Sequence, residues 1–196
     1  MNAKRSKCYN INMLGKLVPT RLLNPQELLA KQLELKFGQF IADLGCGGAG
    51  YFTLPAARLV GNRGKVYAVD ILKSALEGVK SKAKLDNILN IETVWSDLER
   101  VGATSIPPDT LDAALLVNIM FQSRNNRALL DEARRLLKVS GKLLVVDWKV
   151  EPTPFGPPLS DRLSPEKVKE FAGSLGLKEA KQFDAGPYHY GFVLVK

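Results

Sequence analysis

The stretch over residues 40–52 constrains the fold of this chain more than any other, because it joins an apolar run to four glycines. Residues 40–42 are apolar, a carboxylate follows at Asp43, and the glycines fall within residues 45–50. A helical pattern over residues 52–60 comes next. A buried strand, a glycine turn and a helix in this order are typical of open α/β sheets, which bind ligands at the carboxyl ends of parallel strands. Glycines there permit positive φ angles and let a ligand approach the backbone.

Two classes of ligand fit this turn. The run Gly45-Cys-Gly-Gly-Ala-Gly50 satisfies the G-x-G-x-x-G fingerprint of dinucleotide-binding proteins, and Asp70 lies 20 residues beyond it, about where a ribose-binding acid is expected. Asp43 argues against a NAD(P)-dependent oxidoreductase, because a carboxylate two residues before the first glycine would repel an anionic pyrophosphate. S-adenosylmethionine carries no phosphate, and its ammonium and sulfonium groups suit a carboxylate at this position. The oxidoreductase is therefore the less favoured alternative.

The run Asp43-Leu-Gly-Cys-Gly47 resembles motif I of the class I S-adenosylmethionine-dependent methyltransferases. The resemblance covers about residues 24–196. This family usually reads D-x-G-x-G-x-G, whereas here Ala49 stands at the third glycine position, between Gly48 and Gly50. The pattern leaves open which of these two glycines contacts the cofactor.

The resemblance implies an α/β fold with a doubly wound seven-stranded sheet, mostly parallel with an antiparallel last strand, which is the Rossmann-like methyltransferase fold. A second specific match, over residues 130–144, is similar to the corresponding segment of quinone-biosynthesis methyltransferases. Periodicity and turn signals agree with this fold. They predict strands beginning at residue 40 and over residues 65–70, 91–95, 111–118, 142–148, 177–183 and 188–195, and helices over residues 24–38, 49–60, 73–84, 124–138 and 164–175.

Carboxylates recur at the ends of the first three predicted strands, at Asp43, Asp70 and Asp97. By resemblance they match the ammonium, the ribose hydroxyls and the adenine amino group of the cofactor. An acid that caps the next helix is the alternative for Asp70, and an ordinary turn residue is the alternative for Asp97. The remaining cofactor contacts implied by the resemblance are the loop residues Gly45, Cys46, Gly47 and Gly48, Ile71 and Leu98 at the adenine, and Asn118 beneath the methyl group.

The family resemblance implies in-line attack of an acceptor on the sulfonium methyl group. The leaving group is neutral and needs no acid, so the protein mainly positions the reactants. A general base is required only if the acceptor stays protonated at neutral pH. If the strand over residues 177–183 is parallel to the others, the following turn places Tyr188 and His189 beside the cleft, with His189 on the opposite face from the tyrosines. His189, Tyr188 and Asp147 are the candidate catalytic residues, while Cys46 is expected to pack and not to act as a nucleophile.

Composition bounds the remaining possibilities. The 196 residues suit one domain, and one histidine and two cysteines give no metal cluster or disulfide framework. Five of the basic side chains and no acid fall within residues 1–26 of a chain whose net charge is +8. We therefore expect a basic extension over residues 1–23 and a single methyltransferase domain over residues 24–196. The extension is expected to be a solvated tail, and weak contact with nucleic acid or with an acidic partner is the alternative.

The acceptor does not follow from the sequence. A small molecule is expected, covered by the proline-rich segment 149–162, which is otherwise a plain connection. Protein or RNA is the alternative acceptor, and a non-catalytic module that binds no cofactor is a further alternative. A cytoplasmic location is expected, because the two cysteines fit a reducing compartment and no apolar run approaches the length needed to span a bilayer.

Overall fold

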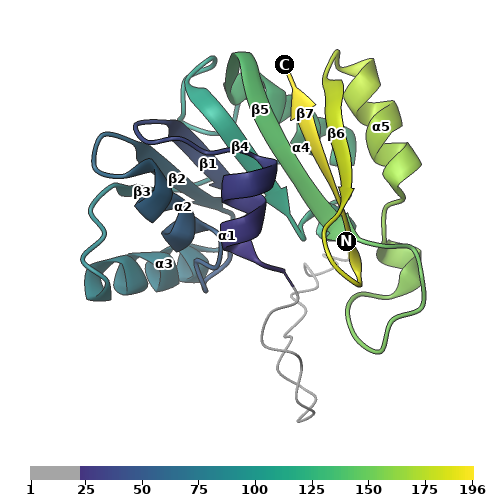
Figure 1. The fold of residues 1–196 in the computed structure, drawn as a ribbon, viewed down its shortest axis with the longest axis horizontal. Helices are drawn as coiled ribbons and strands as arrows, with labels where there is room; N and C mark the ends of the chain where they lie inside the picture. The colour runs from purple at the N-terminus through teal and green to yellow at the C-terminus, as the bar shows by residue number, and fades with distance from the viewer. Residues whose placement is uncertain (1–22) are drawn as a thin grey trace, which may run out of the picture.

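The computed structural model describes residues 23–196, so the predicted basic extension over residues 1–23 lies almost entirely outside the described part of the chain. The described residues form a seven-stranded sheet in the order β3-β2-β1-β4-β5-β7-β6 (Figure 1). Its strands are β1 (Phe40–Leu44), β2 (Lys65–Asp70), β3 (Ile91–Trp95), β4 (Leu111–Val117), β5 (Leu137–Trp148), β6 (Lys178–Asp184) and β7 (His189–Val195). Strand β7 runs antiparallel to both of its neighbours, so β6 is parallel to β5. The predicted fold class is confirmed.

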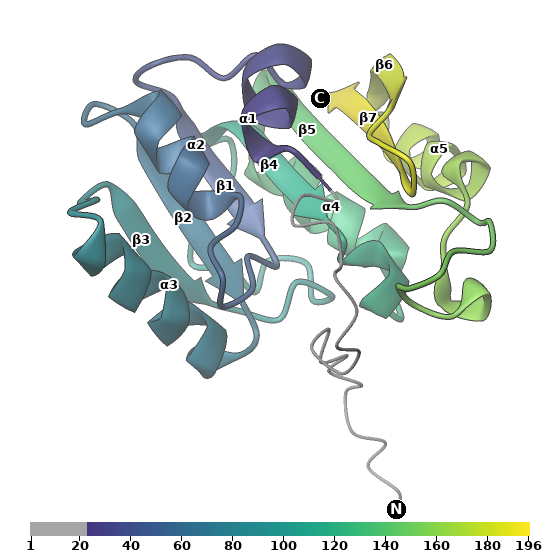
Figure 2. The ribbon, with the colours of Figure 1, turned by 60° about the horizontal axis from the view of Figure 1, so that its bottom comes forward.

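Helices cover both faces of the sheet. They are α1 (Pro25–Glu27), the π-helical turn η1 (Leu28–Gln32), α2 (Thr53–Val60), α3 (Lys73–Leu85), the 3-10 turn η2 (Met120–Gln122), α4 (Asn126–Leu136), the 3-10 turn η3 (Leu159–Asp161) and α5 (Pro165–Ser174). Apolar side chains of η1 and α2 pack on one face, and those of α4 and α5 pack on the other. Helix α3 lies on the same face of the sheet as α2 (Figure 2). Leu76 and Val79 of α3 pack against Ala68 of β2, and Val66 of β2 packs with the apolar side chains of α2. Residues two apart on a strand point to the same face, so both helices cover that face.

Local chemistry explains where these helices begin. The Asn24 side chain accepts the Glu27 N–H at 3.3 Å, as predicted for a capping asparagine before a proline. Helix α2 begins at Thr53 and not at residue 49, so Pro55 occupies its third position. A proline is tolerated there because the N–H groups of the first turn have no partner within the helix.

Two further predicted boundaries were wrong by a wider margin. The first helical segment ends at Gln32 and not near residue 38, because Glu34 adopts a left-handed φ of 58°. Strand β5 begins at Leu137 and not at residue 142, since Leu137 already pairs with Leu111 before a register shift on β4. This long-range pairing carries the chain through Ser140 (φ 65°), where the sequence predicted a helix end.

The parallel register gathers the predicted acids at one edge. Leu44 pairs with Val69, and Asp70 pairs with Trp95, so the carboxyl ends of β1, β2 and β3 lie side by side. Asp97 follows β3 by two residues. Among the described residues, no helix is both long and apolar enough to cross a membrane.

Candidate functional site

A cleft of about 1070 Å³ opens at the carboxyl edge of the sheet. This volume is sufficient for a cofactor-sized ligand, since ligand sites typically measure about 300–1,000 Å³. Seven of the ten predicted cofactor-binding residues line the cleft: Gly45, Gly47, Gly48, Asp70, Ile71, Asp97 and Leu98. Asp43, Cys46 and Asn118 do not line it.

The glycine loop turns sharply between β1 and α2. Gly45 adopts a φ of +83°, and its N–H donates to the Val69 carbonyl at 2.8 Å. A side chain at Gly45 would collide with Ile119, whereas a Cβ at Gly47 (φ +61°) would meet nothing within 4 Å. Gly47 therefore presents open backbone, as a site for a closely approaching ligand requires.

The structure resolves which of the two alternative glycines lies at the cleft. Gly48 lines it, whereas a Cβ at Gly50 would point toward Leu54 and Val79, between α2 and α3. Sequence reasoning missed Gly78 of α3, where a Cβ would lie 2.7 Å from the Gly48 carbonyl oxygen. A glycine inside a predicted helix was the available signal for this close helix–loop contact.

Asp70 ties the glycine loop to the end of β2. Its Oδ2 accepts the Gly47 N–H at 2.9 Å, and its Oδ1 accepts the Leu72 N–H at 2.9 Å. Leu72 is the N-cap residue of α3, and its own side chain cannot cap the helix, so Asp70 stabilises the turn before the helix. A carboxylate has about four acceptor positions, so capacity remains for a ligand hydroxyl. Ile71 is 53% exposed at the mouth of the cleft.

Asp43 lies behind the glycine loop and is only 3% exposed. Its Oδ2 accepts the Thr53 hydroxyl at 2.6 Å, at the start of α2. Burial, and to a smaller extent the charge of Asp70, raise the pKa of Asp43 to about 6, although the Thr53 hydrogen bonds oppose this shift. Asp43 thus presents a charge near the loop without reaching the cleft surface, and Thr53 is a partner that the sequence pattern did not indicate.

Residues 96–99, which follow β3, line part of the cleft. Asp97 Oδ1 accepts the Glu99 N–H at 3.0 Å, which is the turn role considered as its alternative. Its Oδ2 accepts no hydrogen bond from the described residues, so this oxygen is available to a ligand. Ser96, which was not predicted, also lines the cleft, and its buried hydroxyl has no hydrogen-bond partner in the described structure.

Cys46 and Asn118 lie just outside the cleft. The Cys46 side chain packs with Leu76 and Val79, and burial raises the pKa of its thiol, which fits a packing role. Asn118 follows β4 with a φ of +54°, and its N–H donates to the Val146 carbonyl at 2.9 Å. Its side-chain oxygen is buried without a partner.

None of the three candidate catalytic residues lines the cleft. Asp147 is 0% exposed and accepts the N–H groups of Met120 and Trp148 at 2.9 and 2.8 Å. His189 is also 0% exposed, neither ring nitrogen has a partner, and its ring lies 4.3 Å from that of Trp148. Burial lowers the pKa of His189 to about 4, so the imidazole is neutral at pH 7. Tyr188 precedes β7, with its ring 4.9 Å from that of Phe155.

The proline-rich segment 149–162 reaches the cleft through Ser160 and Asp161. Arg162 holds this segment together, because its guanidinium donates to the carbonyls of Lys149, Glu151 and Pro157 and to the Thr153 hydroxyl. The segment is therefore an ordered wall, with its end placed at the cleft.

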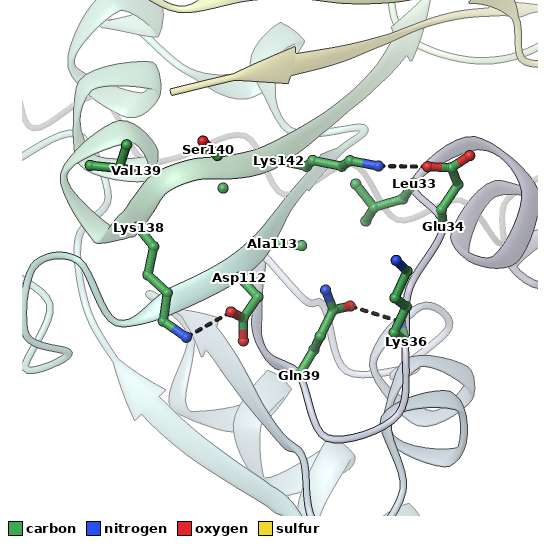
Figure 3. A pocket seen from close by; sticks show the side chains of 11 residues that line it. Leu33, Glu34, Lys36, Gln39, Asp112, Ala113, Lys138, Val139, Ser140 and Lys142 are labelled. Atoms are coloured by element: carbon green, nitrogen blue, oxygen red, sulfur yellow. Dashed lines mark hydrogen bonds and ion pairs between the residues drawn. The ribbon is translucent and has the colours of Figure 1, made fainter.

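A second, smaller depression of about 180 Å³ lies at the opposite, amino edge of the sheet (Figure 3). Four of its charged side chains form two ion pairs, Lys142 with Glu34 at 2.7 Å and Lys138 with Asp112 at 2.6 Å. No predicted site residue lies in this depression.

The cleft residues fit S-adenosylmethionine better than a dinucleotide. Four carboxylates and one guanidinium line the cleft, which disfavours a pyrophosphate and suits a cationic ligand. Open backbone at Gly47 and the unpartnered Ser96 hydroxyl add space and hydrogen-bonding capacity. Among residues 23–196, no group of three or more His, Cys, Asp or Glu side chains is arranged to hold a metal ion.

Comparison with known proteins agrees with this geometry. Residues 41–141 match a family model described as a methyltransferase domain. A crystal structure of an S-adenosylmethionine-dependent methyltransferase from Aquifex aeolicus superposes with a TM-score of 0.82 at 26% identity, covering 91% of this chain and 93% of the other.

Two curated relatives are similar over part of their length. (S)-coclaurine N-methyltransferase from Thalictrum flavum subsp. glaucum is 30% identical over 144 residues, which are 74% of this chain and 38% of the relative. The ubiquinone/menaquinone biosynthesis C-methyltransferase of Escherichia coli O1:K1 / APEC is 35% identical over 115 residues, which are 57% of this chain and 43% of the relative. The chain thus spans about two fifths of the length of these relatives. Together, the family model, the fold and the cleft show that the chain belongs to the S-adenosylmethionine-dependent methyltransferases.

Proposed function

We propose that this protein transfers a methyl group from S-adenosylmethionine to a small-molecule acceptor. The observation that carries the proposal is the acid-lined cleft beside the glycine loop, with Asp70 and Asp97 at the ends of β2 and β3 and open backbone at Gly47. These groups have the order expected for a ligand that extends from an amino-acid part to a nucleoside part.

Each cleft residue has a proposed role toward the cofactor. Asp70 accepts from the ribose hydroxyls, Asp97 accepts from the adenine amino group, and Ile71 and Leu98 pack on adenine. The loop at Gly45, Gly47 and Gly48 supplies close backbone contact. Asp43 acts from behind the loop through its charge, because a buried carboxylate attracts a cation strongly across a short path of low dielectric.

Positioning and exclusion of water are the main contributions of this chain to the reaction. When bound, the cofactor supplies an electrophilic methyl group on a sulfonium that leaves as a neutral thioether. The segment 149–162 and the η2 turn wall the cleft and limit the approach of water. Because Asp147, His189 and Tyr188 lie outside the cleft lining, their role as a general base stays a prediction.

A small acceptor is supported by the names of the relatives, one of which acts on (S)-coclaurine and another in ubiquinone/menaquinone biosynthesis. Protein or RNA is the second candidate, favoured only by the basic residues 1–26. The acidic cleft opposes a polyanion, since four carboxylates face one guanidinium. We also propose a cytoplasmic location, because two cysteines provide no disulfide framework.

A transfer assay tests this proposal. Full-length protein is incubated with tritiated-methyl S-adenosylmethionine and separate cell fractions that contain metabolites, RNA or protein. We expect label in the metabolite fraction, with none in a reaction that contains heat-denatured protein. Label confined to RNA or protein would contradict a small-molecule acceptor, and absence of label from all fractions would favour the non-catalytic alternative.

A further inference from the structure

Asp147 is fully buried on β5, yet its carboxylate binds groups that belong to two different elements. Oδ1 accepts the N–H of Trp148 on its own strand at 2.8 Å. Oδ2 accepts the N–H of Met120 in the η2 turn at 2.9 Å, and the Phe121 N–H is a third partner of the carboxylate. The carboxylate therefore joins the end of β5 to η2.

The η2 turn needs such an acceptor. Its N-cap residue, Ile119, provides no side-chain hydrogen bond, so the first N–H groups of the turn would otherwise lack partners in a buried place. Met120 is completely buried, whereas Phe121, Gln122, Ser123 and Arg124 line the cleft. These four cleft-lining residues are called the η2 wall below. The position of the wall thus depends on a carboxylate that the ligand cannot touch.

We propose that Asp147 is a positioning residue that holds the η2 wall in its ligand-binding geometry, and that only its ionised form does so. The proposal rests on the proposed cofactor role of the cleft. An ionised carboxylate accepts all three N–H groups, whereas a protonated carboxyl group places an O–H where one acceptor is needed. Protonation of Asp147 should therefore loosen the η2 wall, although Asp147 does not contact the ligand.

The charged and titratable groups around Asp147 do not neutralise it. Tyr190 pairs with Asp147 across β5 and β7, but its hydroxyl donates to the Leu163 carbonyl at 2.9 Å. The charge of Arg162 lowers the pKa of Asp147, while burial, the largest effect, raises that pKa to about 6. Burial and the negative charge of Glu166 on α5 raise the pKa of Tyr190. Arg124 belongs to the η2 wall. Asp147 therefore changes charge around pH 6, a pH at which ligand binding can be measured.

Calorimetric titration with 5′-methylthioadenosine tests the proposal. This ligand has the nucleoside part but no ammonium group, so its binding does not report the charge of Asp43. We expect the wild-type affinity to fall about tenfold or more from pH 7.5 to pH 5.0, as for loss of one hydrogen bond to a charged group. Asp147→Asn should bind about fivefold more weakly than wild type at pH 7.5 and vary little with pH.

Asp112→Asn is the matched control, because Asp112 lies at the amino edge and pairs with Lys138 far from the cleft. It should retain both the affinity and the pH profile of the wild type. Wild-type affinity and an unchanged pH profile in Asp147→Asn would overturn the proposal. Failure of the wild-type protein to bind any adenosine ligand would instead contradict the proposed function.

Amide hydrogen exchange provides a second measurement in case Asp147→Asn fails to fold. In the wild-type protein, the Met120 and Phe121 amides should lose protection, relative to strand β4, as the pH falls from 7 to 5. Unchanged relative protection of these two amides would contradict the proposed role of Asp147. A purely structural buried carboxylate would change global stability but not this local difference.

Discussion

Acidic side chains at the two edges of the same sheet have different kinds of partner. At the amino edge, Glu34 and Asp112 pair with Lys142 and Lys138 in contact with solvent (Figure 3). At the carboxyl edge, Asp43, Asp70 and Asp147 form no ion pair with a lysine or arginine among residues 23–196. Their oxygens accept from backbone N–H groups and the Thr53 hydroxyl.

The acids at the amino edge are neutralised by lysines, whereas those at the carboxyl edge keep a charge that a ligand can use. Exposed ion pairs are individually worth little and leave no charge for a ligand. Carboxylates held by neutral donors keep their negative charge, although burial raises the pKa of Asp43 and of Asp147 to about 6. Such costly arrangements cluster at functional sites. Substitutions at the two edges test whether charge at the carboxyl edge, and not at the amino edge, governs cofactor binding.

The largest expected effect comes from Asp70→Ala. This change removes the acceptors of the Gly47 and Leu72 N–H groups and the proposed ribose contact. We expect the affinity for S-adenosylhomocysteine to fall about 100-fold or more, because hydrogen bonds to a charged group are lost together. Calorimetric titration measures the affinity, and a loss smaller than threefold would be inconsistent with the proposed site.

Asp43→Asn should have the next largest effect, because it keeps an acceptor for Thr53 but removes the charge. We expect Asp43→Asn to bind S-adenosylhomocysteine about tenfold more weakly than the wild type at pH 8. Since Asp43 ionises around pH 6, the wild-type affinity should rise as the pH increases through 6, and the variant should show a smaller rise. Unchanged affinity at pH 8 would remove the ammonium role. As the control ligand, 5′-methylthioadenosine lacks the ammonium group and should bind Asp43→Asn and the wild type equally well at pH 8.

His189→Phe should stabilise the protein by about 1–2 kcal/mol, because it removes two buried nitrogens without partners and retains a ring beside Trp148. The pKa of His189 is about 4 in the folded protein against 6.5 ordinarily, so the folded state binds fewer protons between these values. Wild-type stability should therefore fall as the pH decreases from 6.5 toward 4, and the gain should be larger at pH 5 than at pH 7.5. Urea denaturation checks both points; destabilisation together with lost methyl transfer would instead support a functional histidine.

The smallest effect is expected at the amino edge. Glu34→Gln breaks the ion pair with Lys142, which lies in contact with solvent. Affinity for S-adenosylhomocysteine should stay within about twofold of wild type, because exposed pairs contribute little and the cleft is at the other edge. A marked loss of affinity would show that charge at the two edges is not separable.

Local patterns predicted much of this fold. The β-branched runs and turn residues located β2 and β3 to the residue, and the capping residues at Asn24 and Ser164 started helices as expected. The extension of β5 back to Leu137 could not be predicted, because it depends on pairing with Leu111, 26 residues earlier in the chain. Pairing between distant residues leaves little trace in local periodicity.

The candidate site could be predicted to about the same extent as the fold. Seven of the predicted cofactor-binding residues lie at the cleft because strand ends determine their place. The sequence could not indicate that Asp43 turns toward Thr53, that Asp147 binds the η2 turn, or that Gly48 and not Gly50 lines the cleft. Each of these depends on how a side chain or loop packs against a second element.

The most direct test of the central claim is calorimetric titration of the purified full-length protein with S-adenosylhomocysteine, with NADH as the parallel ligand. Micromolar binding of S-adenosylhomocysteine and none of NADH is the result that this account predicts. Binding of NADH alone would show that the glycine loop serves a dinucleotide and would contradict the assignment of the cleft. Binding of neither ligand would contradict a cofactor site formed by this chain alone.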